Sequence, residues 1–382
     1  MTKKLRVGLI GANPGGAVAA TTKGVAPYTS SGESWGAISH VPALRSLPGY
    51  EIAAVCTSRP ETAAAAATAF GVSRSFHDFR QMAQDPDVDI VAVSVRVPFH
   101  HPMVMAALDA GKHVFCEPPF ALNLADAEEM AAAAKKQGVC ALLGLQFRVD
   151  PAMLHLQELL AEGYLGEVRT VHMTMYSPGA IDERPADRMW HGDRKNGAGV
   201  TIIRANHTLD GLCFALGDFT EVAARVETRL KRWRNTDTGE WHDVDAPDHI
   251  MVNGVLEGGA LVSALVAHVP HNSPGYRMEI YGSRGTLVLS STISPQWVPC
   301  VVMGSRDGAP LEELPTPQRF REAPPETPDG PPLNVAHLYQ RLEQAIRTGA
   351  PVDPGFEVGV ARHRLLDALQ RSSDEGRTIR LE

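Results

Sequence analysis

The first 150 residues alternate short, continuously apolar runs with Ala-rich stretches of helical character. The apolar runs lie at 7–10, 52–56, 90–95, 113–116 and 139–143, and the stretches between them include 61–70, 102–110 and 124–136. Runs without polar alternation are typical of strands buried on both faces, which requires a parallel sheet covered by helices. We therefore predict a doubly wound α/β domain over 1–150, with its ligand at the carboxyl ends of the strands.

Composition and charge narrow the class of protein. The 382 residues are enough for about two domains, and hydrophobic and charged fractions of 44% and 21% are ordinary for a globular chain. The 36 Lys and Arg residues against 44 Asp and Glu residues give a net charge of −8, and no basic run stands out. This balance argues against direct binding of nucleic acid and favours a small-molecule substrate.

The five cysteines are far apart and form no Cys-x-x-Cys pair, which predicts reduced thiols, a cytoplasmic protein and no bound metal. Only residues 1–4 precede the first apolar run, so we expect no signal peptide. No apolar run approaches the ~20 residues that span a bilayer, so we expect no membrane segment.

Gly11, Asn13 and Gly16 follow the first apolar run with the spacing G-x-G-x-x-G, except that Asn replaces the middle glycine. Asn tolerates a left-handed backbone better than most residues, so the pattern is weakened but kept. Directly after a strand, it predicts the turn that binds the phosphates of a dinucleotide. We expect Pro14 and Trp35, on the same segment, to contact the cofactor as well.

The second apolar run is followed by Thr57, Ser58 and Arg59, and no acidic residue lies between Val55 and Pro60. Domains that prefer NAD place Asp or Glu near this point to bind the ribose hydroxyls, whereas a 2′-phosphate is bound by hydroxyls and a cation. The residues therefore predict NADP as the cofactor and make NAD the less favoured alternative.

After residue 150 the pattern changes to alternation of apolar and polar residues, as in 171–176. Two hairpins are predicted, from 248–256 with 260–268 and from 277–281 with 286–290, and closing helices from 333–348 and 356–373. We predict an α+β domain over 151–382 with a large open, mainly antiparallel sheet and final helices that pack back. The free face of the sheet would cover the cofactor or join copies into a homodimer or homotetramer.

Seven segments then point to a family. In chain order they read VGLIGAN, GYEIAAVCTSRPE, ALDAGKHVFCEPPFALNLADAEEM, GLQFRVDPAM, GYLGEVRTV, NGAGVTIIRANHTLD and IYGSRGTLVL, and they span nearly the whole chain. Together they resemble the glucose-fructose oxidoreductase and inositol dehydrogenase family, written Gfo/Idh/MocA. The resemblance implies a Rossmann domain, a second domain with an open sheet, and a bound nicotinamide cofactor.

The text SWGAISHVPAL, at 34–44, is similar to a branch of this family that includes the fungal galactose-regulon repressor. In that branch the matching text comes shortly after the phosphate turn, so 15–34 is interpreted as an insertion. It is either a surface loop, which costs little closure entropy per added residue, or a lid that orders over cofactor or substrate.

The resemblance also identifies two departures at expected catalytic positions. Family dehydrogenases commonly read Glu-Lys-Pro where this chain has Glu117, Pro118 and Pro119, so the Lys that handles the proton is replaced by Pro118. The family Asp, one helical turn before a His, is Ile203, whereas the His is kept as His207. We expect His207 to act as acid or base near neutral pH.

Candidates for the missing groups lie nearby in the sequence. Tyr176 and His191 are candidates to move a proton, and Arg204 to hold a carboxylate or hydroxyl, although each side chain singly also fits a structural role. The expected cofactor contacts beyond the turns are Arg96, His100, Glu117, Pro118 and Gln146, of which His100 and Glu117 match family positions beside the nicotinamide.

Two function classes follow. The first is an NADP-dependent oxidoreductase that transfers hydride to or from a sugar-like or other small hydroxy or carbonyl compound. The second is a non-catalytic dinucleotide-binding regulator, which the missing Lys and Asp would allow. We favour the enzyme because His207 and polar neighbours are kept.

Overall fold

The apolar runs near the N-terminus form one six-stranded parallel sheet in the computed structural model, which describes residues 3–15, 34–178, 182–197, 199–269 and 272–381. The strand order is β3-β2-β1-β4-β5-β6, with β1 (Leu5–Ile10), β2 (Tyr50–Cys56), β3 (Arg74–Phe76), β4 (Ile90–Val93), β5 (His113–Cys116) and β6 (Ala141–Leu143). The order reverses at β1 and β4, where a doubly wound sheet binds its ligand. The predicted parallel α/β domain is confirmed.

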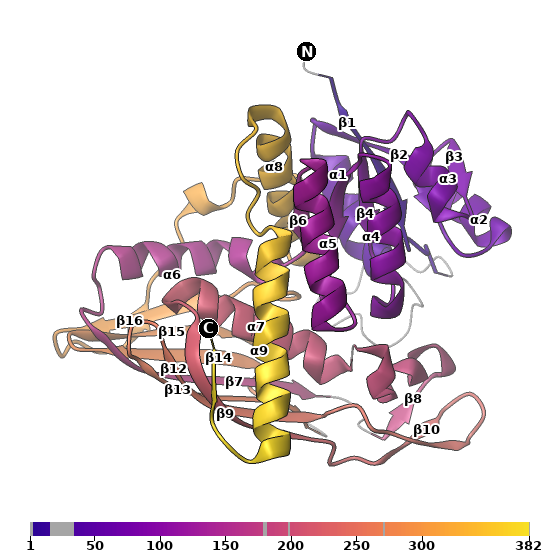
Figure 1. The fold of residues 1–382 in the computed structure, drawn as a ribbon. Coiled ribbons are helices and arrows are strands. Elements are labelled where there is room, and N and C mark those ends of the chain that lie inside the picture. The colour runs from indigo at the N-terminus through magenta and orange to yellow at the C-terminus, as the bar shows by residue number, and fades with distance from the viewer. Residues whose placement is uncertain (1–2, 16–33, 179–181, 198, 270–271, 382) are drawn as a thin grey trace. The chain divides into compact units, whose positions relative to one another are not determined.

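Helices cover this sheet, and some of them carry clear start and stop signals (Figure 1). They are α1 (Val41–Ser46), α2 (Pro60–Phe70), α3 (Phe79–Gln84), α4 (His100–Asp109), α5 (Leu124–Gln137) and α8 (Pro331–Thr348). The Ala-rich α2 begins with a proline at its first position and ends at Gly71, whose left-handed backbone (φ 63°) caps the helix. In α5 the Asn123 side chain accepts from the Asp126 N–H at the start, and Gly138 caps the end.

The C-terminal part forms a nine-stranded sheet in the order β17-β16-β15-β14-β7-β13-β12-β9-β18. Its strands are β7 (Val168–Pro178), β9 (Phe219–Glu227), β12 (His249–Leu256), β13 (Leu261–Val269), β14 (Tyr276–Gly282), β15 (Gly285–Ser291), β16 (Val301–Arg306), β17 (Glu312–Glu313) and β18 (Ile379–Arg380). Only β7 and β13 pair in parallel among these strands, so the expected mainly antiparallel sheet and both hairpins are confirmed.

Alternation decides which face of this sheet is buried. Val171, Met173 and Met175 of β7 belong to one core cluster with apolar residues of α6 (Pro151–Ala161) and α7 (Val200–Leu216). The intervening side chains of β7 point to the opposite face, where Leu261 is 60% exposed. One face is therefore covered by helices, and residues of the other face are open to water.

A small three-stranded sheet was not predicted. It consists of β8 (Glu183–Arg184), β10 (Arg232–Asn235) and β11 (Trp241–Asp243), in the order β11-β10-β8. These strands are too short to show a period of two in the sequence.

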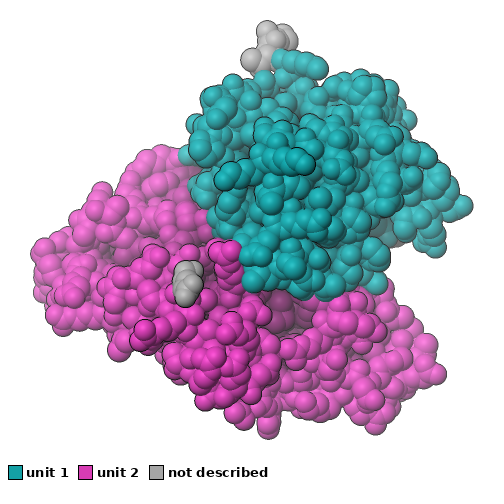
Figure 2. Space-filling view, in the orientation of Figure 1, with its two compact units in different colours: residues 1–144, 322–360 teal, residues 145–321, 361–382 magenta. Residues whose placement is uncertain are grey.

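Contacts divide the chain into two compact units, which Figure 2 shows in different colours. Unit 1 comprises 1–144 and 322–360, and unit 2 comprises 145–321 and 361–382. The sequence predicts a boundary after 150 with 322–360 in the second domain, whereas the contacts group 322–360 with the first unit. That segment holds α8, which packs on α1 within unit 1. None of the helices among the described residues has the length and apolar character that crossing a membrane requires.

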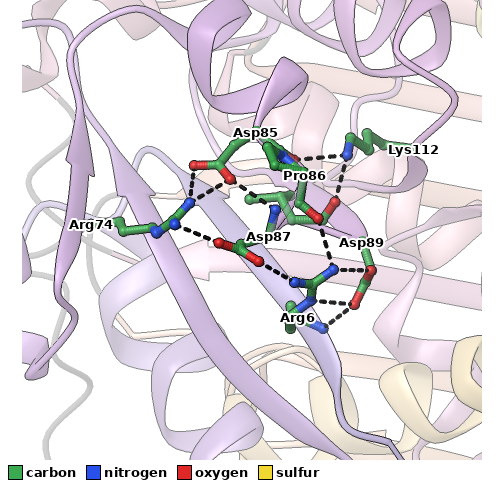
Figure 3. A network of polar contacts seen from close by, with 8 residues as sticks. Arg6, Arg74, Asp85, Pro86, Asp87, Asp89 and Lys112 are labelled. Atoms are coloured by element: carbon green, nitrogen blue, oxygen red, sulfur yellow. Dashed lines mark hydrogen bonds and ion pairs between the residues drawn. The ribbon is translucent and has the colours of Figure 1, made fainter.

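An ion-pair network fastens the amino ends of β1 and β4 (Figure 3). The Arg6 guanidinium donates to both carboxylate oxygens of Asp89, at 2.9 and 3.0 Å, and to Asp87 Oδ1 at 2.6 Å. Arg74 pairs with Asp85 and Asp87, and Lys112 Nζ donates to the Asp85 carbonyl at 2.9 Å. The network lies at the end of the sheet opposite the expected ligand, so we assign it to stability.

We predict that Arg6→Gln lowers the free energy of unfolding by about 2 kcal/mol at pH 7, because it removes charge-assisted hydrogen bonds to a carboxylate. The hydrogen bond from Arg6 lowers the pKa of Asp89, so this stabilisation is present above the unfolded pKa, about 3.9. It is lost as the pH falls through the folded value. Urea unfolding of both proteins should show the difference at pH 7 and little of it near pH 2.5.

The matched control is Arg80→Gln, because the Arg80 side chain is exposed and, among the described residues, stacks on the neighbouring Phe79. It should change stability by less than about 0.5 kcal/mol. Equal losses in the two variants would contradict the role given to Arg6.

Candidate functional site

Gly11, directly after β1, lies where three strand ends meet. Its N–H donates to the Cys56 carbonyl at the end of β2, at 3.0 Å, and Ser94 N–H after β4 donates to the Ile10 carbonyl, at 3.0 Å. Its φ is +92°, and a β-carbon built at residue 11 would stand 2.1 Å from the Ser94 carbonyl oxygen. Only glycine fits, so bare backbone is presented at the switch point of the sheet, as a phosphate turn requires.

The turn continues through Asn13 and Pro14 to the two described ends of the predicted insertion. Asn13 N–H donates to Gly11 O at 3.0 Å and to Ser34 Oγ at 2.8 Å, and Asn13 Oδ1 accepts from Gly15 N–H at 3.2 Å. Residues 16–33, and with them Gly16 and most of the insertion, lie outside the described residues. The two described ends of the predicted insertion therefore lie beside the turn, and the insertion at 15–34 stays a prediction.

A short helix resumes the chain at η1 (Gly36–His40), which continues into α1. Trp35 precedes it and is half-buried. A β-carbon at Gly36 would lie 3.3 Å from the Ala12 Cα, so this glycine lets the helix approach the turn closely.

At the end of β2, Thr57 is hydrogen-bonded within the protein, whereas the Ser58 and Arg59 side chains are exposed. Thr57 Oγ1 donates to the Arg59 carbonyl at 3.1 Å and is 2.6 Å from Thr62 Oγ1, so this hydroxyl is engaged at the start of α2. The Ser58 and Arg59 side chains are exposed at the same helix start. A hydroxyl, a guanidinium and a helix N-terminus in one place fit a phosphate group.

At the ends of β4 and β5 the candidates differ in exposure. Arg96 is exposed before η2 (Val97–Phe99), and Pro118 is half-buried in a cis bond to Pro119. His100 is 1% exposed, and its ring nitrogens lie 3.2 Å from the Phe120 carbonyl and 3.0 Å from the Val95 carbonyl. Burial lowers the pKa of His100. Its side chain contacts two loops of unit 1, and its contact with the nicotinamide stays a prediction.

Glu117 is held by a buried relay that the sequence reasoning missed. Its carboxylate, 7% exposed, lies 2.8 Å from His40 Nε2, and His40 Nδ1 lies 2.8 Å from the Tyr339 hydroxyl of α8. Burial raises the pKa of Tyr339 well above its usual range, so the hydroxyl keeps its proton and donates a hydrogen bond to His40 Nδ1. His40 Nε2–H then donates to the carboxylate. A β-carbon at Gly144 would lie 2.8 Å from Glu117 Oε1, so the glycine leaves room for it.

In unit 2, helix α7 carries Arg204 and His207. Both are buried, and His207 Nδ1 has no hydrogen-bond partner among the described residues. Burial, and then the Arg204 guanidinium, lower the pKa of His207 to about 3. The imidazole is therefore neutral at pH 7. Ile203, at the position of the family Asp, supplies no charge to oppose Arg204.

The remaining candidates of unit 2 are not all brought together. Tyr176 alternates with Met175, which packs in the core cluster, so its side chain lies on the sheet face opposite α7 and His207. His191 is buried in η4 (Ala186–Gly192), with its ring stacked on Trp190 at 3.7 Å. Gln146 is buried in η3 (Gln146–Val149). The fold of unit 2 therefore does not place Tyr176 beside His207, and their roles stay predictions.

A cavity of about 270 Å³ opens in unit 2 beside the start of α7. Its lining is formed by Arg184, His191, Gly199, Val200, Thr201, Arg229, Leu230, Trp233, Val244, Ala246, Pro247, Asp248, His249, His268 and Val269. Of the predicted residues only His191 lines it. Arg184, Trp233 and His268 were missed because they come from short strands and a strand end that carry no motif.

Comparison with known proteins identifies the family. Residues 5–145 match the model described as the oxidoreductase family with an NAD-binding Rossmann fold, and residues 153–288 match the GFO/IDH/MocA C-terminal domain. The chain is 36% identical to dehydrogenase aclE of Aspergillus oryzae over 248 residues, 62% of this chain and 67% of that protein. The chain belongs to the Gfo/Idh/MocA oxidoreductase family.

Solved structures share the whole fold. A levoglucosan dehydrogenase in complex with NADH and L-sorbose superposes with a TM-score of 0.85 at 21% identity, covering 100% of both chains. A super-repressor mutant of Gal80p from Saccharomyces cerevisiae superposes with a TM-score of 0.83 at 21% identity, covering 99% of this chain and 98% of that chain. At this identity the likeness is one of fold, so the resemblance to Gal80p carries no argument for a regulator.

We predict that His40→Ala destabilises the protein by about 3 kcal/mol, because it removes the hydrogen bond to a buried carboxylate. Tyr339→Phe should cost about 1 kcal/mol, the value of one hydrogen bond between neutral groups. Thermal unfolding of the ligand-free protein measures both. His101→Ala, at a partly exposed pair with Glu129, should cost least. A loss in Tyr339→Phe as large as in His40→Ala would contradict the relay.

Proposed function

We propose that this protein is an NADP-dependent oxidoreductase that transfers hydride to or from a sugar-like or other small hydroxy or carbonyl compound. The observation that carries the proposal is the arrangement of two neighbouring strand ends: bare backbone at Gly11 after β1, and an acid-free turn with Ser58 and Arg59 after β2. Membership of the oxidoreductase family supports the same reading.

The residues of unit 1 fit a phosphorylated dinucleotide. Gly11 would hold the pyrophosphate against backbone, and Arg59, with Ser58 and the start of α2, would hold the 2′-phosphate. Glu117, oriented by His40, would hold a polar group of the nicotinamide end. The levoglucosan dehydrogenase is described with NADH, so NADP is the finer and separately testable part of the proposal.

When bound, the nicotinamide supplies hydride chemistry, and the protein must supply one proton transfer. Pro118 and Ile203 cannot do so, which leaves His207 as the family position able to act. His207 is neutral at pH 7, so its lone pair is available for the proton of a substrate hydroxyl, but its pKa of about 3 makes it a weak base and does not match the expected titration near neutral pH. A homodimer or homotetramer and a cytoplasmic location stay predictions.

We predict that Arg59→Gln weakens binding of NADPH by about 10- to 100-fold and leaves binding of NADH within about twofold, because only the 2′-phosphate loses a charge-assisted contact. Fluorescence titration of the bound reduced nicotinamide measures both constants. Arg80→Gln, at another exposed arginine of unit 1, is the control. Equal weakening of both cofactors, or of neither, would remove Arg59 from the proposed site.

We predict that His207→Asn lowers kcat by about 10²- to 10⁴-fold with NADP and the best substrate among levoglucosan, L-sorbose, D-glucose and myo-inositol, while NADPH binding is unchanged. Absorbance of the reduced nicotinamide follows the reaction. His172→Ala, on the exposed sheet face, is the control. Unchanged turnover in the His207 variant, or tight NADPH binding with no turnover of any sugar or sugar acid, would contradict this mechanism.

A further inference from the structure

The cavity of unit 2 is lined by an unusual balance of charge. Four elements contribute basic side chains to it: Arg184 from β8, His191 from η4, His249 from β12 and His268 from β13, with Arg229 after β9. The acidic side chain in its lining is Asp248. The walls between them are apolar or aromatic, including Val244, Ala246 and Trp233.

The carboxylate of Asp248 is already engaged. It accepts from the N–H groups of Arg229 and Leu230, at 2.8 and 2.7 Å, and lies 2.7 Å from His249 Nδ1. Arg229 is largely exposed and pairs with Glu227 at 3.6 Å. Asp248 therefore holds a loop and forms no ion pair with Arg184; the acidic residue whose charge acts on Arg184 is Asp182.

Arg184 is pre-oriented without a carboxylate partner. Its guanidinium lies over the Trp233 ring, 4.6 Å from the centroid, and donates to the Glu183 carbonyl at 2.6 Å. Its Nη2 is 3.4 Å from His268 Nε2, and no ion pair joins it to an acid among the described residues. A half-buried guanidinium stacked on an aromatic ring is arranged to bind a planar anion.

Besides burial, the positive charges near the cavity lower the pKa of His268, the histidine next to Arg184. Burial lowers the pKa of His268 to about 4, and the charges of Arg184, Arg204 and His249 lower it as well. The carboxylate of Asp248 acts in the opposite direction. Arg204 also lowers the pKa of His207. One arginine therefore acts on both the cavity and the expected proton acceptor.

We propose that this cavity binds the carboxylate of an acidic substrate, an organic acid of sugar size, through the Arg184 guanidinium. The inference rests on the proposed function and names the substrate class. About nine waters at ~30 Å³ each would fill 270 Å³, so the space suits a small molecule rather than a whole dinucleotide. Thr201 of the lining and His207 lie on the same helix, six residues and about 9 Å apart along its axis, although His207 itself is buried outside the lining.

The uncapped start of α7 adds to this preference. Gly199 at its N-cap offers no side-chain hydrogen bond, and Gly199, Val200 and Thr201 line the cavity. The positive end of the helix dipole therefore faces the same space as Arg184.

The test compares D-gluconate and D-glucuronate with D-glucose as probes, using calorimetric titration of the full-length protein. We expect both acids to bind at least tenfold more tightly than glucose, and Arg184→Gln to abolish that preference. Arg184→Lys, which keeps the charge but not the planar fork, should retain part of it. Arg232→Gln is the matched control, because Arg232 lies on β10 next to Trp233 and outside the cavity lining.

Each other outcome overturns the inference. Equal binding of acids and glucose would do so, as would an acid preference that survives Arg184→Gln in a protein with wild-type thermal stability. Inorganic phosphate binding as tightly as the acids, or loss of NADPH affinity in Arg184→Gln, would assign the cavity to a phosphate instead. Intact NADPH binding with turnover of neutral sugars alone would contradict only this inference. Absence of NADPH binding by the wild type would contradict the proposed function.

Discussion

The close approach of the backbone after β1 to the backbone after β4 shapes the edge of unit 1 where a ligand is expected. No side chain can stand at residue 11, because the Ser94 carbonyl occupies that space. The tips of β1, β2 and β4 are then joined by backbone hydrogen bonds and present bare peptide groups at the switch point. Every proposed cofactor contact of unit 1 follows a strand of this sheet at the same edge, because parallel strands share one direction.

The relay from Tyr339 through His40 to Glu117 shows how the edge is kept in shape. A carboxylate buried this deeply is stable only with donors at fixed positions. Tyr339 comes from α8, nearly 300 residues after η1, and Tyr50 anchors it further by donating to its carbonyl at 2.6 Å. The C-terminal segment 322–360 therefore completes the first unit rather than only following the second.

In unit 2, some buried or half-buried charges are paired with an opposite charge and others are not. The Arg148 guanidinium is held by Asp210 through hydrogen bonds of 2.8 and 2.7 Å, a buried pair that fixes η3 to α7. Near the start of α7, by contrast, the half-buried Arg184 and His268 and the buried His207 form no ion pair with a carboxylate among the described residues. Burial keeps His207 and His268 neutral at pH 7, so the positive charge of this region comes from Arg184 and Arg204.

Local patterns in the sequence determined the fold class: the continuous apolar runs, the turn at Gly11, and the alternation that predicts the open sheet are all short-range signals. The sequence also shows that the side chains of Pro118 and Ile203 have no proton to transfer in catalysis. Tertiary structure alone decided that Tyr176 faces away from α7, that His40 and Tyr339 hold Glu117, and that Arg184 meets Trp233 and His268. The reason is physical: period and turn chemistry depend on neighbouring residues, whereas hydrogen bonding, burial and the resulting shifts of pKa depend on residues that meet only after folding.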